Sequence, residues 1–98
     1  MDQPFIRYVY LMSHRPGGKI TPDLIQAHIA HLRRLDEGGR LVMCGPFKDY
    51  KGGMVVVKAD SLEDARRIAE SDPFIKDGFE TYELRTWELA CRENGFLG

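Results

Sequence analysis

The segment Phe5–Ser13, FIRYVYLMS, decides the fold because both of its alternating faces are apolar. β-Branched and aromatic residues predominate in it, which predicts a β-strand. Alternate side chains of a strand point to opposite faces. The two sets here are Phe5, Arg7, Val9, Leu11 and Ile6, Tyr8, Tyr10, Met12. A sheet with one solvated face would give one of these sets a polar character. We therefore expect both faces of this strand to be covered.

A long amphipathic helix follows the first strand. The segment Thr21–Gly38 begins with Thr21 as N-cap and Pro22 at the first helical position, and it ends at Gly38-Gly39. At about 100° per residue its larger apolar side chains fill an arc of roughly 140°. These are Leu24, Ile25, Ile29, Leu32 and Leu35.

The rest of the chain predicts three strands and a second helix. The strands are Leu41–Gly45, Met54–Lys58 after a polar turn at Lys48–Gly53, and Phe79–Leu89. Asp60 or Ser61 caps the second helix, whose buried stripe is Leu62, Ala65, Ile68 and Ala69. The order βαββαβ predicts an α+β, ferredoxin-like sandwich, with two helices on one face of a four-stranded antiparallel sheet.

Two helices cover only one face of such a sheet. The other face keeps one apolar set of the first strand and is extended by Tyr82, Leu84 or Trp87. An apolar patch of that size is typical of an interaction surface. We therefore expect a homodimer through the sheet face opposite the helices, which gives a dimeric α+β barrel.

The length and composition of the chain limit its domain number, its partners and its location. The 98 residues predict a single domain over 1–98, with a core of about 5–89 and a C-terminal tail at 90–98. A net charge of −1 without blocks of like charge predicts no binding to nucleic acid or to a membrane surface. Met1-Asp2-Gln3-Pro4 does not resemble a secretory signal, so a cytoplasmic location is expected. Cys44 and Cys91 fit no metal or disulfide pattern and are expected to pack as small apolar residues.

His28 is the first candidate for chemistry, because it falls about 40° inside the apolar arc of the helix. An imidazole among leucines needs a hydrogen-bond partner. It is either a general acid or base or a core histidine bonded to a backbone carbonyl. His31 falls about 20° outside the arc and is expected to be solvated. A metal held by both histidines would need a third ligand, and none is evident, so no metal is expected.

Asp72 is the second candidate. Asp72-Pro73-Phe74 is typical of an N-cap followed by proline at the first position of a new turn. The same carboxylate can also meet an imidazole, and the two roles are compatible. Candidate substrate-binding residues are His14, Gly45, Pro46 and Phe74. Each has a structural alternative, which is a surface loop for His14, a strand-end corner for Gly45-Pro46, and core or dimer interface for Phe74.

Five motifs, in this order and spacing, resemble the YCII-related family, itself similar to the dimeric α+β barrel group that includes muconolactone isomerase. They are His28–Leu35, Gly39-Arg40-Leu41, Cys44–Phe47, Ser61–Ala65 and Asp72-Pro73-Phe74. The resemblance covers about Phe5 to Trp87. The family has a histidine twelve residues before the arginine of Gly-Arg-Leu, and Arg40 identifies it as His28. The resemblance implies that His28 and Asp72 meet in a cleft as a catalytic dyad.

These observations support two functional hypotheses. The first is a cofactor-free enzyme of the isomerase or lyase type, in which a His28–Asp72 dyad moves a proton on a small cyclic or aromatic-derived substrate. No Gly-rich phosphate loop or Ser–His–Asp order is present. Proton transfer by one group contributes about 10²–10⁴-fold, which is too little for amide or phosphodiester hydrolysis. The alternative is a non-catalytic module of the same fold for small-ligand binding or assembly.

Overall fold

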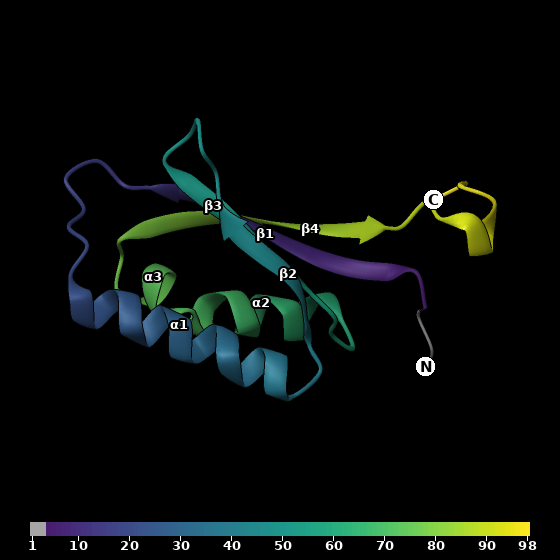
Figure 1. The fold of residues 1–98 in the computed structure, drawn as a ribbon, viewed down its shortest axis with the longest axis horizontal. Coiled ribbons are helices and arrows are strands. Elements are labelled where there is room, and N and C mark those ends of the chain that lie inside the picture. The colour runs from purple at the N-terminus through teal and green to yellow at the C-terminus, as the bar shows by residue number, and fades with distance from the viewer. Residues whose placement is uncertain (1–3) are drawn as a thin grey trace.

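Four antiparallel strands form one sheet in the order β2-β3-β1-β4, and the helices lie together on one of its faces (Figure 1). The computed structural model describes residues 4–98. Residues 1–3 lie outside the described residues. They belong to the N-terminal segment Met1–Pro4, on which the prediction about a secretory signal rests. The elements are β1 (Ile6–His14), α1 (Pro22–Glu37), β2 (Leu41–Pro46), β3 (Gly52–Val57), α2 (Leu62–Ser71), α3 (Pro73–Lys76), β4 (Glu80–Glu88) and the short 3-10 helix η1 (Arg92–Asn94). The predicted βαββαβ ferredoxin-like fold is confirmed. Within residues 4–98, no helix is both long enough and apolar enough to cross a membrane.

The helices begin where their capping residues predict. Thr21 Oγ1 accepts the Leu24 amide at 3.1 Å, and Gly38 closes α1. Ser61 Oγ accepts the Asp64 amide at 3.1 Å, so Ser61 rather than Asp60 caps α2. These side chains supply acceptors for amides that have no partner inside the helix.

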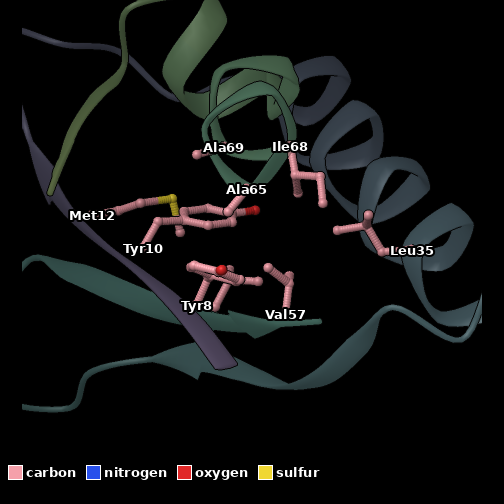
Figure 2. Close-up of a cluster of buried hydrophobic side chains, with 9 residues drawn as sticks. Tyr8, Tyr10, Met12, Leu35, Val57, Ala65, Ile68 and Ala69 are labelled. Carbon is pink, nitrogen blue, oxygen red and sulfur yellow. The ribbon is translucent and has the colours of Figure 1, made fainter. Parts of the chain in front are cut away.

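The core lies between β1, β3 and the helices (Figure 2). Tyr8, Tyr10 and Met12 form the helix-facing set of β1 and are all nearly fully buried. They pack with Leu35, Val55, Val57, Ala65, Ile68 and Ala69. Leu62 was expected in this stripe, but it is 40% exposed, because it lies in the first turn of α2 at the margin of the packed face.

One part of the predicted Lys48–Gly53 turn is wrong, because Gly52 and Gly53 belong to β3. Glycine is disfavoured in strands, so the pair is typical of a turn by composition. Here the absence of a Cβ is required by close packing. A Cβ on Gly52 would overlap the Met12 carbonyl oxygen, and one on Gly53 would lie 2.8 Å from the Gly45 carbonyl oxygen.

The sheet face opposite the helices is only partly apolar. Tyr82 and Leu84 do not lie on it, because they pair with Met12 and Tyr10 and pack against the helix-side core. Trp87 does lie there and is 44% exposed. Its companions on this face are Val9, Leu11, Met54 and Val56, together with the Arg85–Glu83 ion pair at 3.3 Å. The homodimer through this face stays a prediction.

Candidate active site

His28 of α1 and Asp72, between α2 and α3, meet above β1. His28 Nδ1 lies 2.7 Å from Asp72 Oδ1. The Asp72 side chain has no solvent exposure, and that of His28 is 14% exposed. Two residues separated by 44 positions thus form one partly buried hydrogen bond. The fold brings together the pair that sequence reasoning named.

Asp72 accepts three hydrogen bonds, so it serves both as the N-cap of α3 and as the partner of His28. Oδ1 accepts from His28 and from the Phe74 amide, the latter at 3.0 Å, which makes Asp72 the N-cap of α3. Oδ2 accepts the Tyr10 hydroxyl at 2.9 Å. Burial, followed by the Asp72 carboxylate, raises the pKa of Tyr10 well above its ordinary value, so its hydroxyl keeps the proton that it donates.

This donor arrangement sets the tautomer of His28. The Phe74 amide and the Tyr10 hydroxyl both donate to Asp72, which leaves the carboxylate as acceptor toward the imidazole as well. The proton of neutral His28 therefore resides on Nδ1, and Nε2 carries the free lone pair. The Phe74 ring stacks on the imidazole, with centroids 3.9 Å apart and planes 6° apart. Phe74 thus orients both members of the pair.

A cavity of about 550 Å³ opens beside His28. The four candidate substrate-binding residues His14, Gly45, Pro46 and Phe74 all line it. Its walls are mainly apolar and come from α1, the sheet and the α3 region. The remaining apolar residues are Met12, Ile20, Ile25, Ile29, Leu32, Met54, Val55 and Phe79, and the polar ones besides the two histidines are Cys44 and Glu80.

His31 differs from its expected solvated position, because it is only 5% exposed. Its Nε2 lies 3.5 Å from the Tyr10 hydroxyl. Burial lowers the pKa of His31, which Asp72 partly offsets. The rotation of α1 about its axis explains why His31 is buried. Leu24, His31 and Leu35 face the sheet, whereas Ile25 turns toward the cavity and is 37% exposed.

Sequence reasoning missed Glu80, which is only 4% exposed. Glu80 Oε2 lies 3.1 Å from His14 Nε2, and both residues line the cavity. Burial raises the pKa of Glu80. A signal was present, because Glu80 shares the alternating set of β4 with Tyr82 and Leu84, which pack on the core. A carboxylate in such a set needs a partner.

Cys44 and Cys91 are free thiols, and Cys44 is exposed rather than packed in the core. Cys44 lies on the edge strand β2. Although the residue is exposed, partial desolvation of its thiol, followed by Asp36 and Asp72, raises the pKa of Cys44, which disfavours the reactive thiolate. Among residues 4–98, no cluster of three or more His, Cys, Asp or Glu side chains could hold a metal ion.

Comparison with known proteins agrees with this architecture. A family model described as "YCII-related domain" matches residues 6–88. Protein YjpA of Bacillus subtilis (strain 168) is 38% identical over 82 residues, which cover 84% of this chain and 96% of YjpA. Protein YciI of Escherichia coli O6:H1 is 32% identical over 62 residues, which cover 53% of this chain and 63% of YciI.

A solved structure shares the fold. It is 5-chloro-2-hydroxyhydroquinone dehydrochlorinase (TftG) from Burkholderia phenoliruptrix AC1100, in complex with 2,5-dihydroxybenzoquinone. Its TM-score is 0.72 at 24% identity, over 85% of this chain and 94% of that one. The fold and the partly buried histidine–carboxylate pair define an α+β sandwich with a ligand-sized cavity. Within that class, the chain belongs to the YCII-related domain family.

Proposed function

We propose that this protein is an acid–base enzyme of the isomerase or lyase type, in which His28 moves a proton on a small cyclic or aromatic-derived substrate. One observation carries the proposal. Asp72 holds Nδ1 of His28 at 2.7 Å, which leaves Nε2 as a base on a residue that lines the cavity. A positioned imidazole is the commonest general base in enzymes.

The cavity indicates the size and polarity of the substrate. Its volume of about 550 Å³ suits a small molecule. The isoleucines and phenylalanines of its wall favour a flat apolar ring, and its few polar groups would bind substituents on the ring edge. The shared fold with a dehydrochlorinase crystallised with a hydroxyquinone supports the same class of substrate.

The proposed step needs only groups of the chain. In an elimination, Nε2 of His28 takes the proton of a hydroxyl group on the keto tautomer of the ring. The O–H electron pair forms a carbonyl, the ring double bond moves to the halogenated sp³ carbon, and the carbon–halogen bond breaks with its electron pair leaving on the halide. His28 then releases its proton to water, so the net loss is HX. In an isomerisation, Nε2 takes a proton from a ring carbon next to a carbonyl, the C–H electron pair forms a new double bond in the ring, and His28 returns the proton at another ring carbon. Asp72 stabilises the imidazolium between the two steps.

The proposal is tested with 5-chloro-2-hydroxyhydroquinone and related halogenated hydroxy rings under nitrogen, by following halide release or the ring absorbance. His28→Asn is the sharpest variant, because the asparagine amide can replace Nδ1–H toward Asp72 but supplies no base at the Nε2 position. We expect His28→Asn and Asp72→Asn to lose about 10²–10⁴-fold in kcat.

Two exposed residues provide matched controls. Gln26→Ala lies on the outer side of α1, and Asp77→Asn lies at the end of α3. Both should retain wild-type kcat. Wild-type turnover in His28→Asn would refute the proposal. Tight binding of ring ligands without turnover of any substrate in the panel would favour the binding-module alternative.

The partner surface completes the proposal. We propose that the sheet face opposite the helices, with Val9, Leu11, Val56 and Trp87, pairs with its equivalent in a second copy. Val9 and Val56 are already buried within the chain, so the support comes from Trp87, which is 44% exposed on this face, and from half-buried Leu11. Large apolar side chains that share one accessible face are typical of an interaction surface. Sedimentation at micromolar concentration tests it, and a monomer would contradict it.

A further inference from the structure

Glu80 is a buried carboxyl group with few partners. It is the first residue of β4 and lies opposite His14 in the β1–β4 register. Its side chain is 3% exposed, and Oε2 lies 3.1 Å from His14 Nε2. Asp72 by contrast accepts three donors in the same region. A carboxylate buried among apolar groups is costly unless it is paired or protonated.

Glu80 and His28 open into the same cavity. Four charged or titratable groups therefore come together from different elements. They are His14 on β1, His28 on α1, Asp72 before α3, and Glu80 on β4. The Phe74 and Phe79 rings, with centroids 5.2 Å apart, lie between these pairs, since Phe74 stacks on His28 and Phe79 contacts His14 at 4.6 Å. His28 and the His14–Glu80 pair thus line one cavity, and the two phenylalanine rings connect them.

We infer that Glu80 and His14 form a second proton-handling pair, in which Glu80 donates a proton to a carbonyl oxygen of a ring-shaped ligand and His14 returns a proton to Glu80 from solvent. The inference rests on the function proposed above and narrows its ligand to hydroxylated or keto-substituted six-membered rings. Glu80 suits the role because it is enclosed, whereas the His14 side chain is 36% exposed and reaches water.

The environment of Glu80 shifts its carboxyl group toward the protonated form. Burial is the largest influence and raises the pKa of Glu80, His28 opposes this shift, and Asp72 adds to it. A raised pKa brings a carboxyl group closer to the range in which a general acid works.

The combined step is an enolisation whose atoms and charges balance. His28 Nε2 accepts a proton from a ring carbon, and the C–H electron pair forms a carbon–carbon double bond. The carbonyl π pair moves to oxygen, which takes the proton of Glu80. The products are an enol, an imidazolium and the Glu80 carboxylate. The reverse transfers at another ring carbon complete an isomerisation and regenerate both groups.

The first test needs no turnover. The Glu80 carboxyl carbon is followed by NMR during a pH titration of uniformly ¹³C-labelled protein, with exposed Glu88 at the far end of the same strand as internal control. We expect Glu80 to keep its proton to higher pH than Glu88. Identical titration of the two residues would overturn the inference.

The second test uses 2,5-dihydroxybenzoquinone as the binding probe, followed by its absorbance. Glu80→Gln keeps a hydrogen-bond donor but cannot transfer a proton, so probe affinity should stay within about threefold, while kcat on any substrate found falls about 10²-fold or more. Glu80→Ala should weaken both, and Glu88→Gln neither. Failure of the wild-type protein to bind the probe would overturn the ligand class, and an unchanged kcat in Glu80→Gln would overturn the role of Glu80.

His14 is tested by chemical rescue. We expect His14→Ala to lower kcat at least tenfold and imidazole in the buffer to restore it, whereas loss without rescue would overturn the relay. These outcomes are separable from the parent proposal. If His28→Asn is inactive and Glu80→Gln is fully active, only the Glu80–His14 pair is refuted. If His28→Asn is fully active, the His28–Asp72 dyad is refuted, and the NMR titration still decides the protonation state of Glu80.

Discussion

Replacing Asp72 should divide its structural and chemical roles, because three donors converge on one unexposed carboxylate. Asp72→Ala removes the N-cap of α3, a loss of about 1 kcal/mol. It also leaves the fully buried Tyr10 hydroxyl with only His31, at 3.5 Å, which costs about 1–3 kcal/mol. With the lost His28 bond, the free energy of unfolding should fall by about 3–5 kcal/mol.

Asp72→Asn should be much milder. Its remaining oxygen can still accept from the Phe74 amide and from His28 Nδ1, while its amide group faces the Tyr10 oxygen. The lost charge should cost about 1–2 kcal/mol, which is the difference between charged and neutral hydrogen bonds. In a domain of this size 1 kcal/mol corresponds to about 4–8 °C in Tm.

The assay is urea denaturation and thermal melting of both variants beside Asp77→Asn, whose exposed side chain should change stability by less than about 0.5 kcal/mol. The expected order of stability is Asp77→Asn, then Asp72→Asn, then Asp72→Ala. An Asp72→Ala variant as stable as Asp77→Asn would refute the hydrogen-bond analysis. A folded Asp72→Asn variant without turnover would assign the carboxylate a chemical role.

Four further outcomes are expected. The lowered pKa of His31 favours its neutral form in the folded protein, so its contribution to the free energy of unfolding is full above about pH 6.5 and declines as the pH falls below that value. Denaturation at pH 7.5, 6.5 and 5.5 should therefore show a weaker decline in His31→Gln than in the wild type. An unchanged decline would contradict this explanation. Phe74→Leu removes the stacked ring and should cost about 0.5–1.5 kcal/mol in denaturation, with a fall in kcat, whereas full activity would show that stacking does not orient the imidazole. Gly52→Ala should lower the free energy of unfolding by about 1–3 kcal/mol or more, because the added Cβ overlaps the backbone of Met12. Gly45→Ala should have a Tm near that of the wild type, because the added Cβ has no atom within 4 Å. Equal Tm values for the two variants would refute the packing argument. Leu11→Glu should give monomers in sedimentation at a concentration where wild type is dimeric, and a persistent dimer would place the interface elsewhere.

The sequence predicted the elements well, because their signals are local. Thr21-Pro22, Ser61 and Asp72-Pro73 each place a side-chain acceptor before a helical turn, and the structure has all three caps. The order of the elements then restricts the sheet to a single familiar topology. Gly52 and Gly53 were misread because their role depends on contacts with Met12 and Gly45, which are distant in sequence.

The candidate site was only partly predictable for the same reason. His28 stood out as an imidazole within an apolar arc, but the rotation of α1 against the sheet cannot be derived from periodicity to within 20°. A small rotation decides that His31, rather than Ile25, faces Tyr10. Glu80 is a charged residue in the alternating set of β4 that otherwise packs on the core, and the sequence shows this. Its partner His14 is 66 positions away, however, and only the register of β1 and β4 brings the two together.

The two carboxyl groups of the cavity illustrate how burial alone does not decide a role. Both are almost fully enclosed, yet Asp72 meets a backbone amide, a tyrosine hydroxyl and an imidazole, whereas Glu80 meets a half-exposed histidine. Three donors replace the water that a carboxylate loses on burial, and they fix the position of Asp72 against His28. Glu80 lacks that support, and burial raises its pKa, so its acid form persists to higher pH than that of an ordinary glutamate. Because the environments of the two groups differ in this way, one set of apolar walls can hold a base and an acid at once.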